Sequence, residues 1–95
     1  MKAKLSPLVG QRLKDLYQKD PKLVLRIEKQ ISLFESNPRH PSLRTHKLTG
    51  KVGNRWSISI NKSLRMVYVI VEYENGGEFV AYFVDIGTHN QVYGK

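Results

Sequence analysis

Two stretches near the N-terminus place their hydrophobic residues at helical spacing. The first has Val9, Leu13, Leu16 and Tyr17, and the second has Val24, Ile27, Ile31 and Phe34. Ser6-Pro7 and Asp20-Pro21 each match a helix start, a capping side chain followed by proline in the first turn. Asn37-Pro38 ends the second stretch. The pattern predicts two helices joined by a short connection, which should form an antiparallel hairpin.

The period changes in the second half of the chain. Residues 55–60 alternate polar and apolar side chains, which predicts a strand with one buried face. Residues 64–73 and 79–86 are rich in β-branched and aromatic residues, and Glu74-Asn75-Gly76-Gly77 between them is a turn signal. Residues 43–48 are a weaker strand candidate. We therefore expect one α+β domain over residues 1–95, with the N-terminal helical hairpin packed on one face of a three- to four-stranded antiparallel sheet.

Composition agrees with a single globular domain and limits where it works. The 95 residues are 40% hydrophobic and 25% charged. The absence of cysteine excludes disulfides and thiolate metal ligands and fits a reducing compartment. The N-terminal residues contain no apolar core of signal-peptide length, and the apolar run Met66–Val71 is too short to span a bilayer. We expect a cytoplasmic protein with no membrane partner.

The positive charge is concentrated in one part of the sequence. The net charge is +8, but basic and acidic residues are interleaved in the helical half. Residues 36–71 contain no Asp or Glu. Their basic residues are Arg39, Arg44, Lys47, Lys51, Arg55, Lys62 and Arg65, with His40 and His46. Random placement of eight acidic residues would seldom leave such a gap. We expect this segment to bind a polyanion, and RNA in particular.

Alternation assigns side chains of the first predicted strand to two faces. Arg55, Ser57, Ser59 and Asn61 share one face, and Trp56, Ile58 and Ile60 share the other. We expect the helices to cover the face that contains Trp56. The opposite face would then offer donors to phosphate and ribose oxygens. A polar, solvated sheet face without a function is the alternative.

The missing carboxylates bear on mechanism. Two-metal phosphoryl chemistry needs clustered acidic residues, and residues 36–71 supply none. If the protein cuts nucleic acid, we expect it to use no metal and no cofactor. The nucleophile would be the ribose 2′-hydroxyl, assisted by acid–base side chains and by cations that stabilise the phosphorane. This route is open to RNA and closed to DNA.

The C-terminal segment contains the remaining candidate chemistry. We expect Gly87, just past a strand, to form a turn that brings His89 and Tyr93 back over the sheet. An imidazole can exchange protons near neutral pH. The alternatives are that His89 is a structural hydrogen-bond donor and that Tyr93 is a partly buried anchor.

Taken in order, five segments resemble a known toxin superfamily. They are residues 37–44, 46–50, 55–60, 64–68 and 86–93, the last including Gly87-Thr88-His89. They resemble the RelE/ParE superfamily, and most of all the RelE and YafQ-like branch of bacterial type II toxin–antitoxin systems. The resemblance covers nearly the whole chain. It implies a ribosome-dependent mRNA interferase that is silenced by a cognate antitoxin protein.

The resemblance also implies roles for individual residues. Arg65 matches the arginine that contacts the scissile phosphate, and His89 matches a general acid or base. Tyr93 matches the terminal aromatic residue that contacts the substrate. His46 and Lys47 match a basic pair, with His46 sharing proton transfer. The predicted catalytic residues are thus Arg65, His89, His46 and Tyr93, and the predicted RNA-binding residues are Lys47, Arg55, Arg44, Lys51, Ser57 and Ser59.

Some positions depart from the family pattern. Many relatives have aspartate where this chain has Ser63 and an acidic residue where it has Asn90. YafQ-like toxins have aspartate and histidine at the positions of Ser57 and Ser59. Two alternatives to the nuclease therefore stay open: a ParE-like inhibitor of DNA gyrase, and a degenerate, non-catalytic homologue that only completes a complex with its antitoxin.

Overall fold

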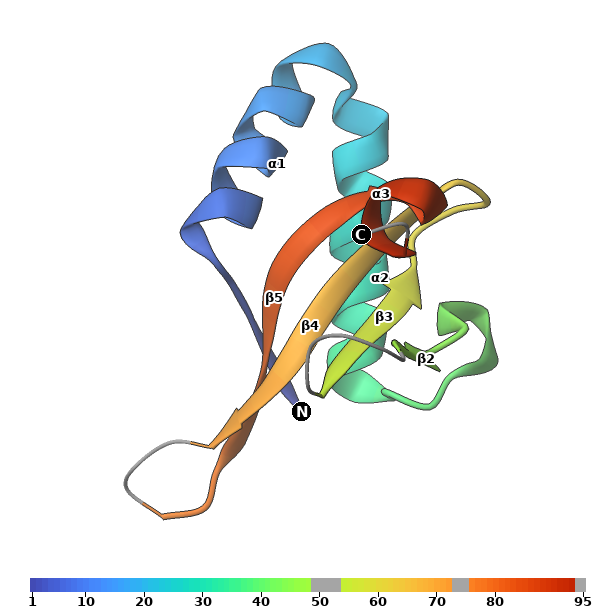
Figure 1. The fold of residues 1–95 in the computed structure, drawn as a ribbon. Helices are drawn as coiled ribbons and strands as arrows, with labels where there is room; N and C mark the ends of the chain where they lie inside the picture. The colour runs from blue at the N-terminus through green and yellow to red at the C-terminus, as the bar shows by residue number, and fades with distance from the viewer. Residues whose placement is uncertain (49–53, 73–75, 94–95) are drawn as a thin grey trace.

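The structure, a computed structural model, describes residues 1–48, 54–72 and 76–93, with the backbone alone for His89 and Tyr93. In chain order its elements are β1 (Lys2–Leu5), α1 (Pro7–Lys19), α2 (Pro21–Ser36), the 3-10 helix η1 (Pro41–Leu43), β2 (His46–Lys47), β3 (Arg55–Ser59), β4 (Leu64–Glu72), β5 (Phe79–Thr88) and α3 (His89–Tyr93). Figure 1 shows the sheet with α1 and α2 behind it and α3 in front.

Both predicted helix starts are confirmed. The Ser6 hydroxyl accepts a hydrogen bond from the Val9 amide, and the Asp20 carboxylate accepts one from the Leu23 amide. Each cap satisfies a donor that the first turn of a helix leaves without an intrahelical partner. The two helices lie antiparallel, as expected (Figure 1). No helix in the described part of the chain is long and apolar enough to cross a membrane.

The sheet differs from the prediction in size and direction. It has five strands in the order β1-β5-β4-β3-β2, and β1 runs parallel to β5 while the other pairs are antiparallel. The expectation of three or four antiparallel strands was therefore wrong at β1. This strand has only four residues. A pairing across most of the chain length, between Lys2 and Val80, gives no local sequence signal.

The core lies between the sheet and the helical hairpin. Val9 of α1 and Ile27 and Phe34 of α2 are buried against the inward side chains of β3, β4 and β5. Phe34, Tyr68 and Phe83 form an aromatic cluster with ring centroids 5.0 to 5.6 Å apart. The helices thus cover the sheet face that contains Trp56 and Ile58, as the alternation predicted. Tyr17 is a correction, because it is 60% exposed and does not join the buried stripe of α1.

The β4–β5 hairpin extends beyond the rest of the sheet (Figure 1). Its turn was predicted over residues 74–77, of which Glu74 and Asn75 lie outside the described residues. Gly76 and Gly77 have φ of 136° and 76°, which explains the glycines because other residues rarely adopt such values. The strand expected over residues 43–48 is shorter in the structure, since η1 occupies its beginning and β2 contains only His46 and Lys47.

Candidate functional site

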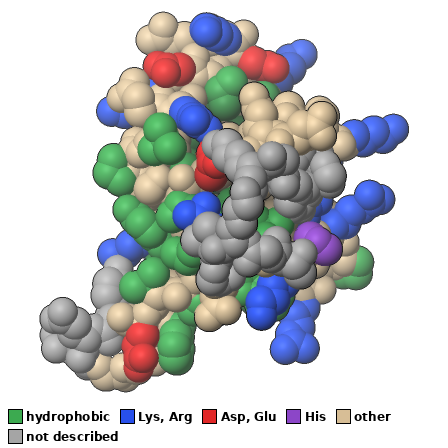
Figure 2. All heavy atoms as spheres, viewed as in Figure 1, with side chains coloured by type: hydrophobic (Ala, Val, Ile, Leu, Met, Phe, Trp, Pro, Cys, Tyr) green, Lys and Arg blue, Asp and Glu red, His purple; other side chains and the backbone are tan. Residues whose placement is uncertain are grey.

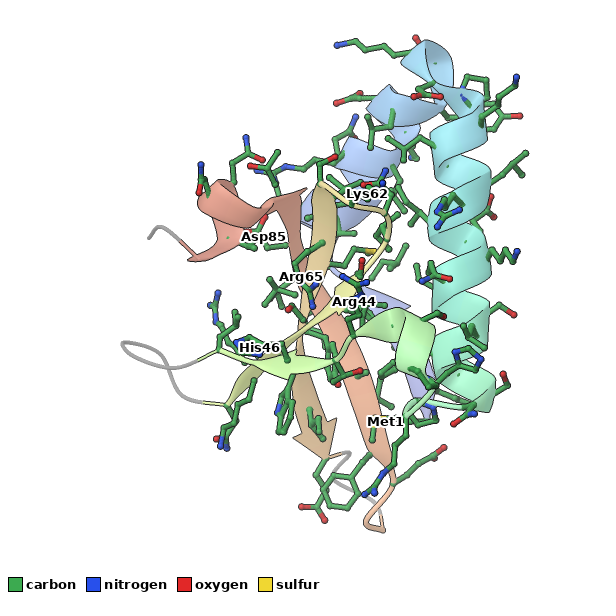
Figure 3. The ribbon with its side chains drawn as sticks, turned by 90° about the vertical axis from the view of Figure 1, so that its right-hand side faces the viewer. Met1, Arg44, His46, Lys62, Arg65 and Asp85 are labelled. Atoms are coloured by element: carbon green, nitrogen blue, oxygen red, sulfur yellow. The ribbon has the colours of Figure 1, made fainter. Side chains whose placement is uncertain are left out.

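The candidate site lies on the sheet face opposite α1 and α2, which we call the outer face. Ile58, Met66 and Tyr68 point into the core, so their strand neighbours Ser57, Arg65 and Val67 point to the outer face. Ser57 pairs with Val67 and Ser59 with Arg65 across β3 and β4. Figure 3 shows α2 and α3 on opposite sides of the sheet, so α3 also lies over the outer face.

Arg65 lies on this face, and hydrogen bonds to neighbouring segments hold its guanidinium. Nε donates to the Ser57 hydroxyl at 3.0 Å, and Nη2 donates to the main-chain carbonyl of Arg44 at 2.7 Å. The two acceptors come from β3 and from the residue that follows η1. The position of the Arg65 charge is therefore fixed by two segments outside its own strand.

Arg44 has an unusual backbone conformation. Its φ of 45° and ψ of 51° are left-handed, and it ends η1. This region costs a residue other than glycine about 1 to 2 kcal/mol. Leu43, which precedes it, is fully buried. The buried leucine anchors the segment, and the left-handed turn places the Arg44 carbonyl at the Arg65 guanidinium (Figure 3).

The basic pair His46-Lys47 is divided between the two faces of the sheet. His46 pairs with Ser57 and Lys47 pairs with Trp56, and directly opposed residues in an antiparallel pair point to the same face. His46 is therefore on the outer face with Ser57 and Arg65. Lys47 is on the other face, where its Nζ lies 5.7 Å from the centre of the Trp56 ring. Lys47, a predicted RNA-binding residue, is therefore on the opposite face of the sheet from Arg65.

The backbone of α3 follows directly from the strand beside Arg65. Gly87 pairs with Arg65 within β5, so the prediction of a turn at Gly87 was wrong and the strand continues to Thr88. The helix α3 then begins at His89 and ends at Tyr93. The fold brings these two backbone positions to the same face as Arg65 and His46. The side chains of His89 and Tyr93 lie outside the part of the chain that the structure describes.

A reciprocal cap determines where α3 starts. The Thr88 amide donates to the Gln91 side-chain carbonyl at 2.8 Å, and the Gln91 amide donates to the Thr88 hydroxyl at 3.3 Å. This is a capping box, a threonine followed three residues later by glutamine. A Cβ at Gly87 would lie 2.7 Å from the Gln91 side-chain oxygen, so a larger residue there would displace Gln91 from this cap. The Thr-x-x-Gln spacing was visible in the sequence and was missed.

An ion pair joins the same end of β5 to α1. The Nη1 atom of Arg12 donates both to the Asp85 carboxylate, at 2.9 Å, and to the Ile86 carbonyl, at 2.8 Å. Asp85 is the only acidic residue in β5. Its carboxylate also accepts from the Ile86 amide. These contacts fix the strand end from which α3 departs, and nothing in the local sequence pairs Arg12 with Asp85.

The other predicted RNA-binding residues are less uniform than expected. Ser57 is fully buried, which corrects the expectation that it faces solvent. Asn61 lies beyond β3, where its side-chain oxygen accepts from the Ser63 and Leu64 amides. Ser59 is half-buried and its hydroxyl donates to the Asn61 carbonyl. Arg44 is exposed, Arg55 is half-buried, and Lys51 lies outside the described residues.

Arg55 has a feature of its own. Its Nε atom is buried and makes no hydrogen bond in the structure. A buried donor without an acceptor costs about 1 to 3 kcal/mol, so an acceptor that reached this atom would be favoured. Arg55 pairs with Val69 and shares the outer face with Ser57. It therefore remains a candidate contact for an anionic ligand.

The outer face differs in chemistry from one part to another. Figure 2 looks onto it and shows hydrophobic side chains on one side of the grey atoms, with Lys and Arg side chains and a histidine on the other. In the described part of the chain, no three His, Cys, Asp or Glu side chains are grouped as metal ligands would be. The groups that the fold does assemble on this face are guanidinium, imidazole and hydroxyl.

This arrangement suits chemistry on a phosphodiester. A fixed guanidinium can stabilise the charge that develops on phosphorus-bound oxygens. An imidazole within reach can accept a proton from an attacking hydroxyl or donate one to a leaving oxygen. Arg65 and His46 are both adjacent to Ser57, one through a side-chain hydrogen bond and one through strand pairing. The geometry is therefore compatible with the predicted reaction.

Comparisons with known proteins reveal similarity in structure. No protein-family model and no curated protein matches the sequence. Among solved structures, the YoeB/ParE toxin from Agrobacterium tumefaciens is similar with a TM-score of 0.74 and 20% identity, over 94% of this chain and 99% of that one. YafQ from E. coli strain BL21(DE3) gives a TM-score of 0.71 at 16% identity, over 97% of both chains.

A third similar structure is a complex. It is the E. coli DinJ–YafQ toxin–antitoxin complex, with a TM-score of 0.70 and 17% identity, over 97% of this chain and 96% of that one. These similarities cover 94 to 97% of this chain. The chain has the fold of the YoeB and YafQ toxins, the fold that its resemblance to the RelE/ParE superfamily implied.

Proposed function

We propose that this chain is the toxin of a type II toxin–antitoxin system, and that it is an endoribonuclease that cuts mRNA on the ribosome in the cytoplasm. The observation that supports this most is the Arg65 guanidinium, held at 3.0 and 2.7 Å by Ser57 and Arg44 on the face that also contains His46. A cation held in this way needs no reorganisation when charge develops on a phosphate.

In the proposed reaction the ribose 2′-hydroxyl attacks the adjacent phosphorus. The bond from O2′ to phosphorus forms, and the bond from phosphorus to O5′ breaks. His46 or His89 accepts the hydroxyl proton, and the other imidazole donates a proton to O5′. Arg65 stabilises the pentacoordinate intermediate, and Tyr93 contacts a base. The products are a 2′,3′-cyclic phosphate and a 5′-hydroxyl, so neither water nor a metal ion is consumed.

We also propose that a cognate antitoxin binds the chain and silences it. The support is the similarity to the toxin of the DinJ–YafQ complex, together with the net charge of +8. A partner with acidic and apolar residues would complement the cationic and hydrophobic parts of the outer face. Binding there would also exclude RNA.

The test is controlled expression in a bacterial host, followed by primer extension on cellular mRNA. The wild-type protein should arrest growth and produce discrete cuts. Arg65→Ala should reduce cleavage about 100-fold or more, because a single fixed donor to a developing oxyanion contributes that much. It should cost more than any single lysine substitution.

Lys29→Ala is the control, since it removes a positive charge from an exposed position of α2, on the opposite side of the sheet from the site. It should leave the cuts in place. Growth arrest that survives both Arg65→Ala and His89→Ala would contradict the site assignment. DNA damage without RNA cuts would indicate a gyrase inhibitor, and harmless expression without an antitoxin would indicate a non-catalytic homologue.

A further inference from the structure

Ser57 is on the outer face but cannot contact a ligand. Its side chain is fully buried, while strand alternation places it among residues that were expected to meet RNA. Burying a hydroxyl is unfavourable unless the group is hydrogen-bonded. The bond that this hydroxyl accepts comes from Nε of Arg65, at 3.0 Å. The serine therefore interacts with the candidate catalytic arginine and is shielded from RNA.

The Arg44 carbonyl provides the second contact to the same edge of the guanidinium. It accepts from Nη2 of Arg65 at 2.7 Å. Nε and Nη2 lie on one edge of the planar group, so two acceptors there restrict both its plane and its rotation. The left-handed conformation of Arg44 and the complete burial of Leu43 keep this carbonyl in position.

We propose that Ser57 is a positioning residue, whose buried hydroxyl and the Arg44 carbonyl together orient the Arg65 guanidinium toward the scissile phosphate. This inference rests on the proposed function. Ser57→Ala keeps the positive charge of Arg65 and its contact with the Arg44 carbonyl, but it removes the hydroxyl acceptor at Nε. Affinity for RNA should therefore change little, whereas the rate of the chemical step should fall about tenfold, the equivalent of one hydrogen bond to a charged group.

Single-turnover cleavage of a ribosome-bound mRNA by the purified protein separates these two effects. Ser57→Ala should lower the maximal rate and leave the concentration for half-saturation unchanged. In a protein that already carries Arg65→Ala, adding Ser57→Ala should not lower the cleavage rate further. The effects of two substitutions are not additive when one residue acts through the other. An equal loss in both backgrounds, or a loss confined to RNA affinity, would overturn the proposal.

Ser36→Ala is the control for loss of a hydroxyl. Its hydroxyl donates to the Leu33 carbonyl within α2, at 3.1 Å, on the opposite side of the sheet from the site. It should leave the cleavage rate and the Arg65 side chain unchanged. Ser57→Ala truncates a buried side chain, which could affect folding. Thermal unfolding of each variant should therefore be measured before the cleavage rates are compared.

A second measurement does not depend on RNA cleavage. The side-chain Nε–H resonance of Arg65 in a ¹⁵N NMR spectrum, assigned by its absence in Arg65→Lys, should shift and exchange faster with water in Ser57→Ala. An unchanged resonance would overturn the orienting contact, whatever the activity. A shifted resonance in a protein that leaves RNA uncut would contradict the proposed function and the catalytic role of Ser57, while the contact itself would stand.

Discussion

At the residue scale, Ser57 is a polar side chain on the outer face of the sheet that is nevertheless fully buried. Alternation along residues 55–60 placed Ser57 opposite Trp56 and Ile58, as the structure does. It could not show that Ser57 is buried, because burial depends on residues from other segments, such as Arg65, whose Nε donates to the Ser57 hydroxyl. Exposure depends on neighbouring strands, which a local pattern does not contain.

A residue whose ionisation should affect stability is Tyr68. It is 5% exposed, its ring packs against Phe34 and Phe83, and burial raises its pKa above the ordinary value of 10.0. The unfolded chain therefore ionises at a lower pH than the folded protein does. The stability that protonated Tyr68 contributes is complete below pH 10 and is lost as the pH rises toward the folded pKa.

Urea unfolding between pH 8 and pH 11 checks this prediction. Tyr68→Phe should show a smaller fall in unfolding free energy above about pH 10 than the wild type shows. Tyr17→Phe is the matched control, because it removes a phenol that is 60% exposed. The same pH dependence in Tyr68→Phe and in the wild type would show that burial of Tyr68 does not govern this loss.

At the element scale, local signals predicted the elements that depend on local contacts. The caps at Ser6 and Asp20 lie within three residues of their partners, and both helices were found. Strand β1 was not predicted, because the groups that hold it in place are far from it in sequence. It pairs with β5, and the Ala3 amide donates to the Glu35 carboxylate at the end of α2. Its sequence Lys-Ala-Lys-Leu does alternate, but four residues are too few for the pattern to identify a strand.

Helix α3 was also missed, although a local signal was present. The Thr88-x-x-Gln91 spacing is a capping-box signal, but the five residues of α3 are too few to show a helical hydrophobic period. We predict that Gln91→Ala weakens the start of α3 by about 1 kcal/mol, the usual value of a helix cap. Because α3 supplies His89 and Tyr93, cleavage should fall as well. Gln91→Glu should retain most of both, since glutamate also completes a capping box.

Hydrogen exchange of the Thr88 amide, which donates to the Gln91 side chain, reports on the cap directly. Exchange should accelerate in Gln91→Ala and stay slow in Gln91→Glu. Gly87→Ala provides an independent perturbation, because its added carbon would lie 2.7 Å from the Gln91 oxygen. If cleavage were unaffected by both Gln91→Ala and Gly87→Ala, the position of α3 would not matter for the reaction.

At the scale of the whole molecule, the fold separates a structural face from a candidate reactive face. The helices and the aromatic cluster occupy one side of the sheet, and Arg65, His46 and the backbone of α3 occupy the other. Residues 36–71, which contain no Asp or Glu, supply β2, β3 and all of β4 except its last residue. In β5 the single acidic residue, Asp85, is paired with Arg12. Positive charge on the outer face therefore meets little opposing charge from these strands.

The architecture was predictable in outline because it follows from the order and periods of the elements. The detailed site was not, because Arg65 is oriented by residues 8 and 21 positions away in sequence. The YoeB/ParE toxin and YafQ have a similar fold although they share only 16 to 20% sequence identity with this chain. The activity must therefore be tested at the site itself.

The most direct test of the account uses an mRNA in which the nucleotide on the 5′ side of a mapped cut has its 2′-hydroxyl replaced by hydrogen. We predict that the purified protein, supplied with ribosomes, no longer cuts at that position. The unmodified mRNA should give an upstream fragment that ends in a 2′,3′-cyclic phosphate. Continued cutting at the deoxynucleotide would show that another nucleophile attacks the phosphate, and it would contradict the proposed mechanism.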